Sequence, residues 1–195
     1  MAKKLDKILV VDIEATCWEG EPRVGEVSEI IEVGACMLNL GPKICADDAT
    51  IEDIDSLLVK PTQSKVSPFC TRLTTLTQTQ VDKGVQFMDA VSWIRKAYLA
   101  QSYSWASWGD YDRKMFEKQC RDFSQPYPFG PTHINVKNLF AVSFGLSKEV
   151  NVDKALEILG LTFEGTPHRG VDDAKNIARI LKETLIRCQS QPKNR

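Results

Sequence analysis

The stretch VVDIEATCWEG, which spans Val10–Gly20, decides the fold of this chain and raises the question of its function. Residues 8–11 form an apolar run that does not alternate with polar residues, which predicts a strand over residues 7–13 that is buried on both faces. Asp12 and Glu14 stand at the end of that strand, and side-chain alternation places both on the same face. Two carboxylates so close together repel each other unless positive charge lies between them.

Around this strand, the hydrophobic pattern predicts a single α/β domain. Two stretches rich in β-branched residues, joined by a loop, predict strands at 30–40 and 53–59 that form an antiparallel meander with the first. The later elements expected are a helix at 87–98, a strand at 103–108, a helix at 111–123, a strand at 133–136, and helices at 137–144, 152–159 and 172–187. Three strands followed by alternating helices and strands predict a mixed five-stranded sheet flanked by helices. We expect one domain over residues 1–188 and a polar tail over 189–195.

The composition is typical of a globular protein without a strong charge bias. Hydrophobic residues make up 43% of the 195 residues, and 25 basic residues nearly balance 26 acidic ones, which leaves a net charge of −1. This balance argues against an indiscriminate polyanion binder but allows a local basic groove. Apolar runs stay shorter than the roughly 18 residues of a membrane span, and the first is too short for a signal peptide. We therefore expect a cytoplasmic protein that does not associate with membranes.

Two further acidic clusters lie where helices are expected to begin. Asp110 and Asp112 stand in the segment SWGDYD, and either could serve as a helix N-cap or first-turn residue. The segment PHRGVDDA opens the last helix, where Asp172 and Asp173 could merely cap the helix and His168 could be an ordinary loop histidine. Taken singly, these structural interpretations are the more common ones, as is a solvated strand end for the first pair of carboxylates.

Taken together, the acidic clusters predict a site for hard divalent cations. The six cysteines and two histidines show no spacing typical of a zinc site, and carboxylate oxygens suit Mg²⁺ or Mn²⁺. Carboxylates from separate segments could hold two such ions about 3.5–4 Å apart, an arrangement used for phosphodiester displacement. An imidazole, with an unperturbed pKa of about 6.5, is a suitable base for the attacking water.

Five segments, in this order, resemble one known family. They are VVDIEATC (10–17), SEIIEVGA (28–35), LTTLTQTQVD (73–82), WGDYDRKMFEKQC (108–120) and PHRGVDDAKNIARIL (167–181). They are similar to the motifs of DnaQ-like 3′–5′ exonucleases, in particular the DEDDh branch with a histidine in its third motif, and within it the Eri-type enzymes that trim RNA 3′ ends. The resemblance runs from residue 8 to about 185, and it implies a ribonuclease H-like fold.

The resemblance implies four acidic metal ligands and one histidine base. The residues that match the first and third motifs are Asp12, Glu14, Asp173 and His168. In the second motif both Asp110 and Asp112 are candidates. Asp112 follows an aromatic residue and fits the family pattern better, which leaves Asp110 as a neighbour or a helix cap.

The resemblance also implies residues that contact the substrate. Ala15 and Thr16 are expected beside the 3′-terminal nucleotide, with their backbone amides available to its ribose hydroxyl. Leu76 is expected to wedge against the terminal base, although the family commonly has glycine where Thr75 stands. Trp18 is a candidate for stacking on a base, with packing as the alternative.

The implied reaction removes nucleoside 5′-monophosphates one at a time from a single-stranded 3′ end, with RNA favoured over DNA. The resemblance implies two Mg²⁺ ions, for which Mn²⁺ can substitute, with His168 as the base and Asp12 as the bridging ligand. Two alternatives stay open at this point. One is a nuclease that scavenges very short oligonucleotides, and the other is a non-catalytic module that binds nucleic acid on the same fold.

Overall fold

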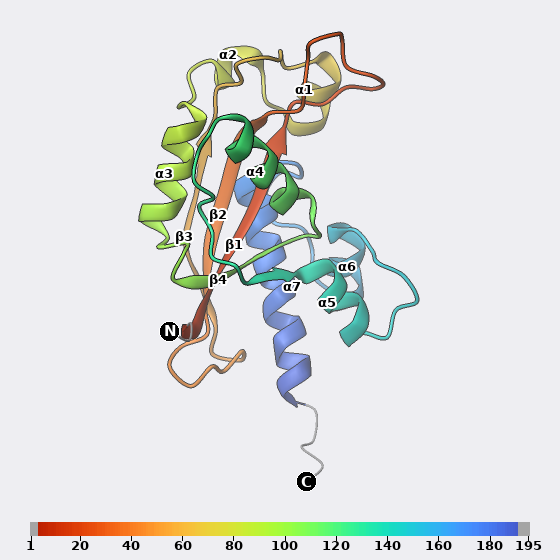
Figure 1. Cartoon of the computed structure of the whole chain (residues 1–195). Coiled ribbons are helices and arrows are strands. Elements are labelled where there is room, and N and C mark those ends of the chain that lie inside the picture. Colours follow the sequence, from red (N-terminus) through yellow and green to blue (C-terminus); the bar gives the residue numbers. More distant parts are fainter. Residues whose placement is uncertain (1–3, 191–195) are drawn as a thin grey trace.

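A five-stranded sheet in the order β3-β2-β1-β4-β5 forms the centre of the computed structural model, which describes residues 4–190 (Figure 1). The strands are β1 (Lys4–Ala15), β2 (Ile30–Asn39), β3 (Thr50–Leu58), β4 (Tyr103–Ser107) and β5 (His133–Asn135). β1, β2 and β3 pair antiparallel, whereas β4 runs parallel to both β1 and β5. The mixed five-stranded sheet flanked by helices that the sequence predicts is therefore confirmed.

Helices cover both faces of this sheet (Figure 1). They are α1 (Pro68–Thr74), α2 (Gln78–Val81), α3 (Phe87–Ala97), α4 (Tyr111–Asp122), α5 (Val136–Ser143), α6 (Val152–Leu159) and α7 (Gly170–Ser190). One hydrophobic cluster joins the sheet to α3 and α4, and a second joins the opposite face to α5, α6 and α7. The central strands are thus buried on both sides, as the apolar run of β1 predicts.

The alternation of side chains along β1 decides which face carries the acidic residues. Leu9, Val11 and Ile13 belong to the cluster under α3 and α4. Ile8 and Val10 belong to the cluster under α5, α6 and α7. Burial of each of these side chains contributes about 1.5–3 kcal/mol relative to exposure, so a slip of β1 by one residue would be strongly disfavoured. The even-numbered residues that follow Val10 therefore face α7.

Several element boundaries differ from the expected ones. The short helices α1 and α2 are absent from the sequence prediction, because each is defined by capping rather than by a long apolar stripe. The Ser67 side chain accepts a hydrogen bond from the N–H of Cys70, and Thr77 forms a reciprocal capping box with Gln80. β1 and α7 extend beyond both of their expected ends.

The C-terminal boundary also lies later than expected. α7 continues to Ser190 and so includes the first two residues of the expected polar tail. The Gln189 side chain accepts a hydrogen bond from the N–H of Ala46, which ties this end of the helix to the loop between β2 and β3. The rest of the expected tail, residues 191–195, lies outside the described residues. Among residues 4–190, none of the helices has the length and apolar character needed to cross a membrane.

Candidate active site

Asp12 and Glu14 lie near the carboxyl end of β1, on the face that α7 covers. The paired register between β1 and β4 ends at Val10 and Ala106, so the last residues of β1 run beyond β4. Asp12 and Glu14 follow the alternation that buries Ile8 and Val10 on this face. The strand thus brings two carboxylates to the edge of the parallel part of the sheet, where ligands commonly bind in α/β folds.

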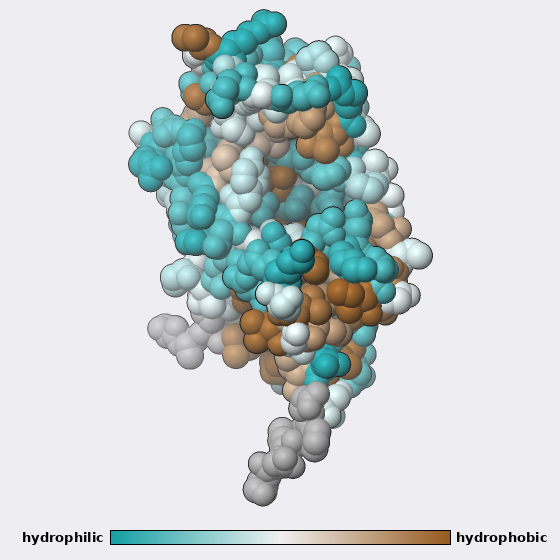
Figure 2. Space-filling view, turned by 90° about the vertical axis from the view of Figure 1, so that its right-hand side faces the viewer, coloured by the Kyte–Doolittle hydropathy of each residue, from teal (hydrophilic) through white to brown (hydrophobic). Residues whose placement is uncertain are grey.

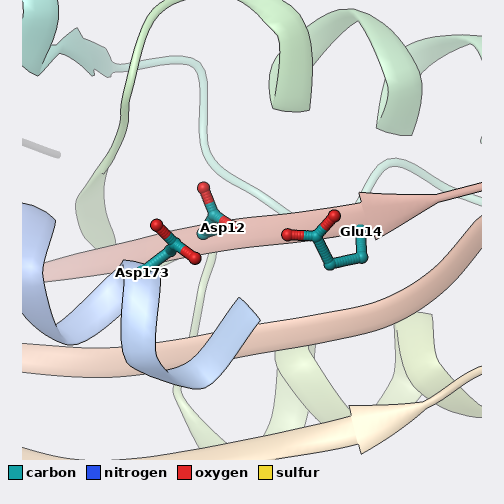
Figure 3. A group of neighbouring side chains, drawn as sticks. All are labelled: Asp12, Glu14 and Asp173. Carbon is teal, nitrogen blue, oxygen red and sulfur yellow. The ribbon is translucent and has the colours of Figure 1, made fainter. Parts of the chain in front are cut away.

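Asp173 reaches this pair from the first turn of α7. Atoms from the carboxylates of Asp12, Glu14 and Asp173 all lie within 4.8 Å of one another, and Figure 3 shows the three side chains converging between β1 and α7. The close approach depends on two glycines. A Cβ atom on Gly34 would lie 1.9 Å from the carbonyl carbon of Gly170, so α7 can begin against β2 only because side chains are absent at this contact.

Asp112, in the first turn of α4, is the fourth carboxylate of the site. It is 4% exposed, and its Oδ1 accepts a hydrogen bond from the N–H of Ile13, between the two acidic residues of β1. Asp110 differs in both respects: its side chain is 43% exposed and pairs with Arg113 at 3.1 Å. The structure therefore brings Asp112 to the acidic cluster and directs Asp110 away from it.

Burial and mutual repulsion raise the pKa of the clustered carboxyl groups. For Glu14, burial is the main cause and the charges of Asp173 and Glu32 add to it, which raises its pKa to about 8. Burial, followed by repulsion from Asp112, raises the pKa of Asp12 well above its usual value. Burial also raises the pKa of Asp112 and the pKa of Asp173 to about 6. Hydrogen bonds to the Asp112 carboxylate oppose the shift there, and the nearby His168 imidazole opposes it at Asp173.

Such a set of carboxylates is poorly stable without positive charge between its members. Clustered carboxylate oxygens from three separate elements, which are buried or half-buried and repel one another, are the ligands that hard divalent cations prefer. The positive charge of Arg169 lowers the pKa of Glu14, but its effect is smaller than burial and the repulsion from the other carboxylates, so it does not offset them. The residues present therefore fit a divalent-cation site.

His168 lies at the edge of the cavity that these carboxylates line. The cavity has a volume of about 320 Å³, and the segment Pro167–His168 forms part of its wall. The histidine is exposed and has a φ angle of 60°, in the left-handed region that side chains rarely adopt. The face of the molecule in Figure 2 is hollowed near its centre, and mostly hydrophilic residues surround the hollow.

Aromatic side chains that the sequence analysis did not assign to substrate binding also line this cavity. Trp108, Tyr111 and Phe163 contribute to its wall, and Tyr111 is 55% exposed. Trp108 and Tyr111 lie on either side of Gly109 and Asp110 in the second motif. Aromatic residues next to an acidic motif were therefore a sequence signal that could have predicted a role in substrate binding. Phe163 carried no comparable signal, because it lies in a loop that only the fold brings to the site.

Two of the expected substrate contacts fall on buried residues. Leu76 is fully buried in a cluster with Ile31, Cys70 and Val81. Thr75, before it, has a φ angle of 65°, the region that glycine adopts most readily.

Thr16 is also fully buried, and its backbone N–H donates to the carbonyl of Glu29. The contacts expected of Leu76 and Thr16 with a nucleotide stay predictions. Ala15 is 7% exposed. Trp18 is partly exposed, and it is not among the residues that line the cavity. Contacts of Ala15 and Trp18 with a nucleotide stay predictions.

Comparisons with known proteins agree with this geometry. A 3′-5′ exoribonuclease 1 of Rattus norvegicus is 34% identical over 190 residues, which cover 92% of this chain and 53% of that protein. The chain thus spans about half the length of this curated relative. A solved structure of the nuclease domain of 3′hExo, described as a DEDDh family member bound to rAMP, is 34% identical with a TM-score of 0.79 and covers 93% of this chain and 92% of that chain.

A solved full-length 3′-exonuclease is 33% identical with a TM-score of 0.80, over 95% of this chain and 62% of that chain. The model of the RNase_T family, described as "Exonuclease", matches residues 9–181, a range that contains the acidic cluster and His168. This match covers most of the chain, and it includes every element that contributes to the cavity. The chain therefore belongs to the RNase_T family of exonucleases.

Proposed function

We propose that this protein is a metal-dependent 3′–5′ exonuclease that releases nucleoside 5′-monophosphates one at a time from single-stranded nucleic acid, with RNA favoured over DNA. The observation that carries the proposal is the convergence of carboxylates from β1, α4 and α7 on one cavity, with His168 at its edge. A domain that only binds nucleic acid has no use for clustered, mutually repelling acids, because they also repel phosphates. The non-catalytic alternative is therefore disfavoured.

The residues that would hold cations are Asp12, Glu14, Asp112 and Asp173. Divalent cations, for which we propose two Mg²⁺ ions with Mn²⁺ as a substitute, would neutralise charge on the scissile phosphate and make a bound water more acidic. The carboxylates are held in place before any ligand arrives, since Asp112 is fixed to β1 through Ile13 and Asp173 is fixed by its place in α7. Such preorganisation is the largest part of electrostatic catalysis.

His168 acts in this proposal as the general base. Its imidazole accepts a proton from the attacking water, whose oxygen forms a bond to the last phosphorus. The bond between that phosphorus and the 3′ oxygen of the preceding nucleotide breaks in the same displacement. The products are a nucleoside 5′-monophosphate and a strand that is one nucleotide shorter and ends in a 3′-hydroxyl group.

The aromatic residues of the cavity wall are proposed to hold the terminal nucleotide. Trp108 and Tyr111 offer faces for stacking on a base, which is tolerant of base identity. A volume of about 320 Å³ is at the lower end of the usual range for ligand sites, which suits one terminal nucleotide better than a duplex. The preference for RNA is supported by the similar proteins, which include a 3′-5′ exoribonuclease and a nuclease domain bound to rAMP.

The experiment that tests this proposal uses RNA and DNA single strands with 5′ or 3′ labels, incubated with Mg²⁺ or with EDTA. We expect a ladder of shortened 5′-labelled strands, release of a labelled mononucleotide from 3′-labelled strands, and no reaction in EDTA. Asp12→Asn is expected to abolish this reaction and to retain the fold by circular dichroism. Full activity of Asp12→Asn, or cleavage from the 5′ end, would overturn the proposal.

The dependence of the rate on substrate length distinguishes the proposed exonuclease from the remaining alternative, a nuclease that scavenges very short oligonucleotides. A scavenging nuclease would degrade strands of two to five nucleotides much faster than long ones. We propose a role in RNA processing, for which we expect comparable rates per terminal nucleotide on short and long RNA. A cytoplasmic site of action stays a prediction, which localisation of a tagged protein would check.

A further inference from the structure

Glu32 is a buried carboxylate that the proposed reaction does not use. It lies on β2 directly opposite Glu14 in the register with β1, and it is fully buried. Glutamate side chains are almost never fully buried unless they are paired. A second glutamate beside an acidic site therefore calls for an explanation.

The contacts of Glu32 lead to the segment that carries His168. Arg169 donates to both carboxylate oxygens of Glu32, from Nε at 3.1 Å and from Nη2 at 3.0 Å. The N–H of Gly170 donates to Oε2 at 3.1 Å. Arg169 directly follows His168 in sequence, so a bidentate ion pair and a backbone hydrogen bond fix the chain immediately after the histidine.

These contacts also explain why Glu32 is not a further cation ligand. Its two oxygens already accept three hydrogen bonds, and it is absent from the wall of the cavity. The N–H of Arg169 donates in turn to Oδ2 of Asp173, so the same residue also touches the acidic cluster. Arg169 thus binds Glu32 through its guanidinium and contacts the acidic cluster through its backbone N–H.

The backbone around His168 is restrained from both sides. It is exposed, its φ angle is 60°, and this strained conformation persists only where neighbouring contacts over-determine the backbone. On the N-terminal side, the N–H of Thr166 donates to Asp172 at 2.8 Å, which restrains the loop two residues earlier. On the C-terminal side, Asp173 accepts the N–H of Arg169, and Glu32 accepts the Arg169 guanidinium and the N–H of Gly170.

We propose that Glu32 is a positioning residue, which holds His168 in the orientation that the reaction needs through Arg169 and Gly170. The proposal rests on the proposed function, in which His168 is the base. Loss of this restraint leaves the carboxylate ligands in place, because they are held by β1, α4 and α7. It allows His168 to sample orientations in which its imidazole does not reach the attacking water.

The variant that tests this role is Glu32→Gln, which keeps the shape of the side chain but removes its charge. The glutamine NH₂ group is a hydrogen-bond donor, so it cannot accept the hydrogen bonds that a glutamate oxygen accepts from Arg169 and Gly170. We expect kcat to fall by about 10- to 100-fold, as expected for misplacement of a reacting group by about 1 Å. KM for a short RNA is expected to stay unchanged when it is measured at saturating Mn²⁺, a condition needed because Glu32 also repels the cation ligand Glu14. In a His168→Ala background, Glu32→Gln is expected to have no further effect on kcat, because it acts through the missing imidazole.

Glu29→Gln provides a matched control. Glu29 is also a buried glutamate next to β2, with 2% exposure, but its carboxylate accepts hydrogen bonds from Thr62, Gln63 and Ser64 rather than from α7. It therefore reproduces the cost of replacing a buried, hydrogen-bonded carboxylate without touching the His168 segment. Any effect of Glu29→Gln on kcat is expected to persist in the His168→Ala background.

A second readout does not depend on activity. The chain contains two histidines, so the imidazole signals of His168 and His133 can be followed separately by NMR after histidine labelling. We expect Glu32→Gln to shift or broaden the His168 signals and to leave those of His133 unchanged, whereas Glu29→Gln leaves both unchanged. Additive kinetic effects of Glu32→Gln and His168→Ala, or an unchanged His168 signal in Glu32→Gln, would overturn the proposal.

Failure of the proposed function gives a different result. In that case the His168→Ala variant keeps the activity of the wild-type protein, or the wild-type protein has no 3′–5′ activity. The NMR comparison still decides whether Glu32 orders the His168 segment.

Discussion

Glu14→Gln is expected to stabilise the protein in the absence of divalent cations. Burial, and repulsion from Asp173 and Glu32, raise the pKa of the Glu14 carboxyl from 4.5 to about 8. Because the folded state binds this proton more tightly than the unfolded state, the contribution to stability is greatest below pH 4.5 and is lost as the pH rises toward 8. Glutamine removes the ionisation and keeps nearly the same shape.

The size of the effect follows from the same two pKa values. Each pH unit between them corresponds to about 1.4 kcal/mol, so the interval from 4.5 to about 8 gives a limit of about 5 kcal/mol at high pH. At pH 8 the effect is about 4 kcal/mol, because half of the Glu14 carboxyl groups in the folded state still hold the proton. For a domain of this size, 1 kcal/mol shifts the melting temperature by about 2–4 °C. We therefore expect Glu14→Gln to melt up to roughly 15 °C above the wild-type protein in EDTA at pH 8, and the difference to vanish near pH 4.5.

The assay is thermal unfolding at several pH values, in EDTA and with Mg²⁺ or Mn²⁺. Added cations are expected to raise the melting temperature of the wild-type protein more than that of Glu14→Gln, because the wild-type cluster has more repulsion to relieve. Glu52→Gln is the control, since hydrogen bonds from Thr50 and Asn39 lower the pKa of Glu52, so its replacement should not stabilise the protein. The reasoning is refuted if Glu14→Gln melts below the wild-type protein in EDTA at pH 8.

Three further changes test the site and its scaffold. Asp112→Asn is expected to lower the rate of 3′ trimming at least about 100-fold, whereas Asp110→Asn keeps most of it, and equal losses in the two variants would contradict the assignment of Asp112. Gly34→Ala places a Cβ atom 1.9 Å from the backbone of α7, where ordinary contact begins at 3.4 Å. The start of α7 must therefore shift, which should cost about 1–3 kcal/mol of stability in thermal unfolding and about 100-fold in rate, while Gly20→Ala, with no atom within 4 Å, serves as the neutral control. Trp108→Ala is expected to raise KM for RNA by roughly 10-fold or more by loss of stacking, and an unchanged KM would remove Trp108 from the nucleotide site.

Much of the architecture could be predicted because local patterns determine it. The apolar run at residues 8–11 specifies a strand with both faces buried, and the alternation of side chains then places Asp12 and Glu14 on one face. The helices α3, α4, α6 and α7 follow from apolar residues at helical spacing. The short helices α1 and α2 were missed because their signals are single capping residues.

The candidate site could be predicted only in part. The order of the motifs indicated which acidic residues belong together, but Asp110 and Asp112 lie in the same short segment and differ only in what surrounds them. The choice between them rests on a hydrogen bond between Asp112 and Ile13, which are 99 residues apart in sequence. The burial of Leu76 and of the Thr16 amide likewise depends on how distant segments pack.

The sequence by itself thus determined the strand that presents two carboxylates, the set of acids and the histidine that accompany it, and the chemistry that such a set can perform. Only the tertiary structure decided which residues meet: Glu32 and Arg169, 137 residues apart, form the ion pair that fixes the chain beside His168. The physical reason is that periodicity and residue type act over a few residues, whereas hydrogen bonds and close approaches such as that of Gly34 and Gly170 depend on the packing of whole elements.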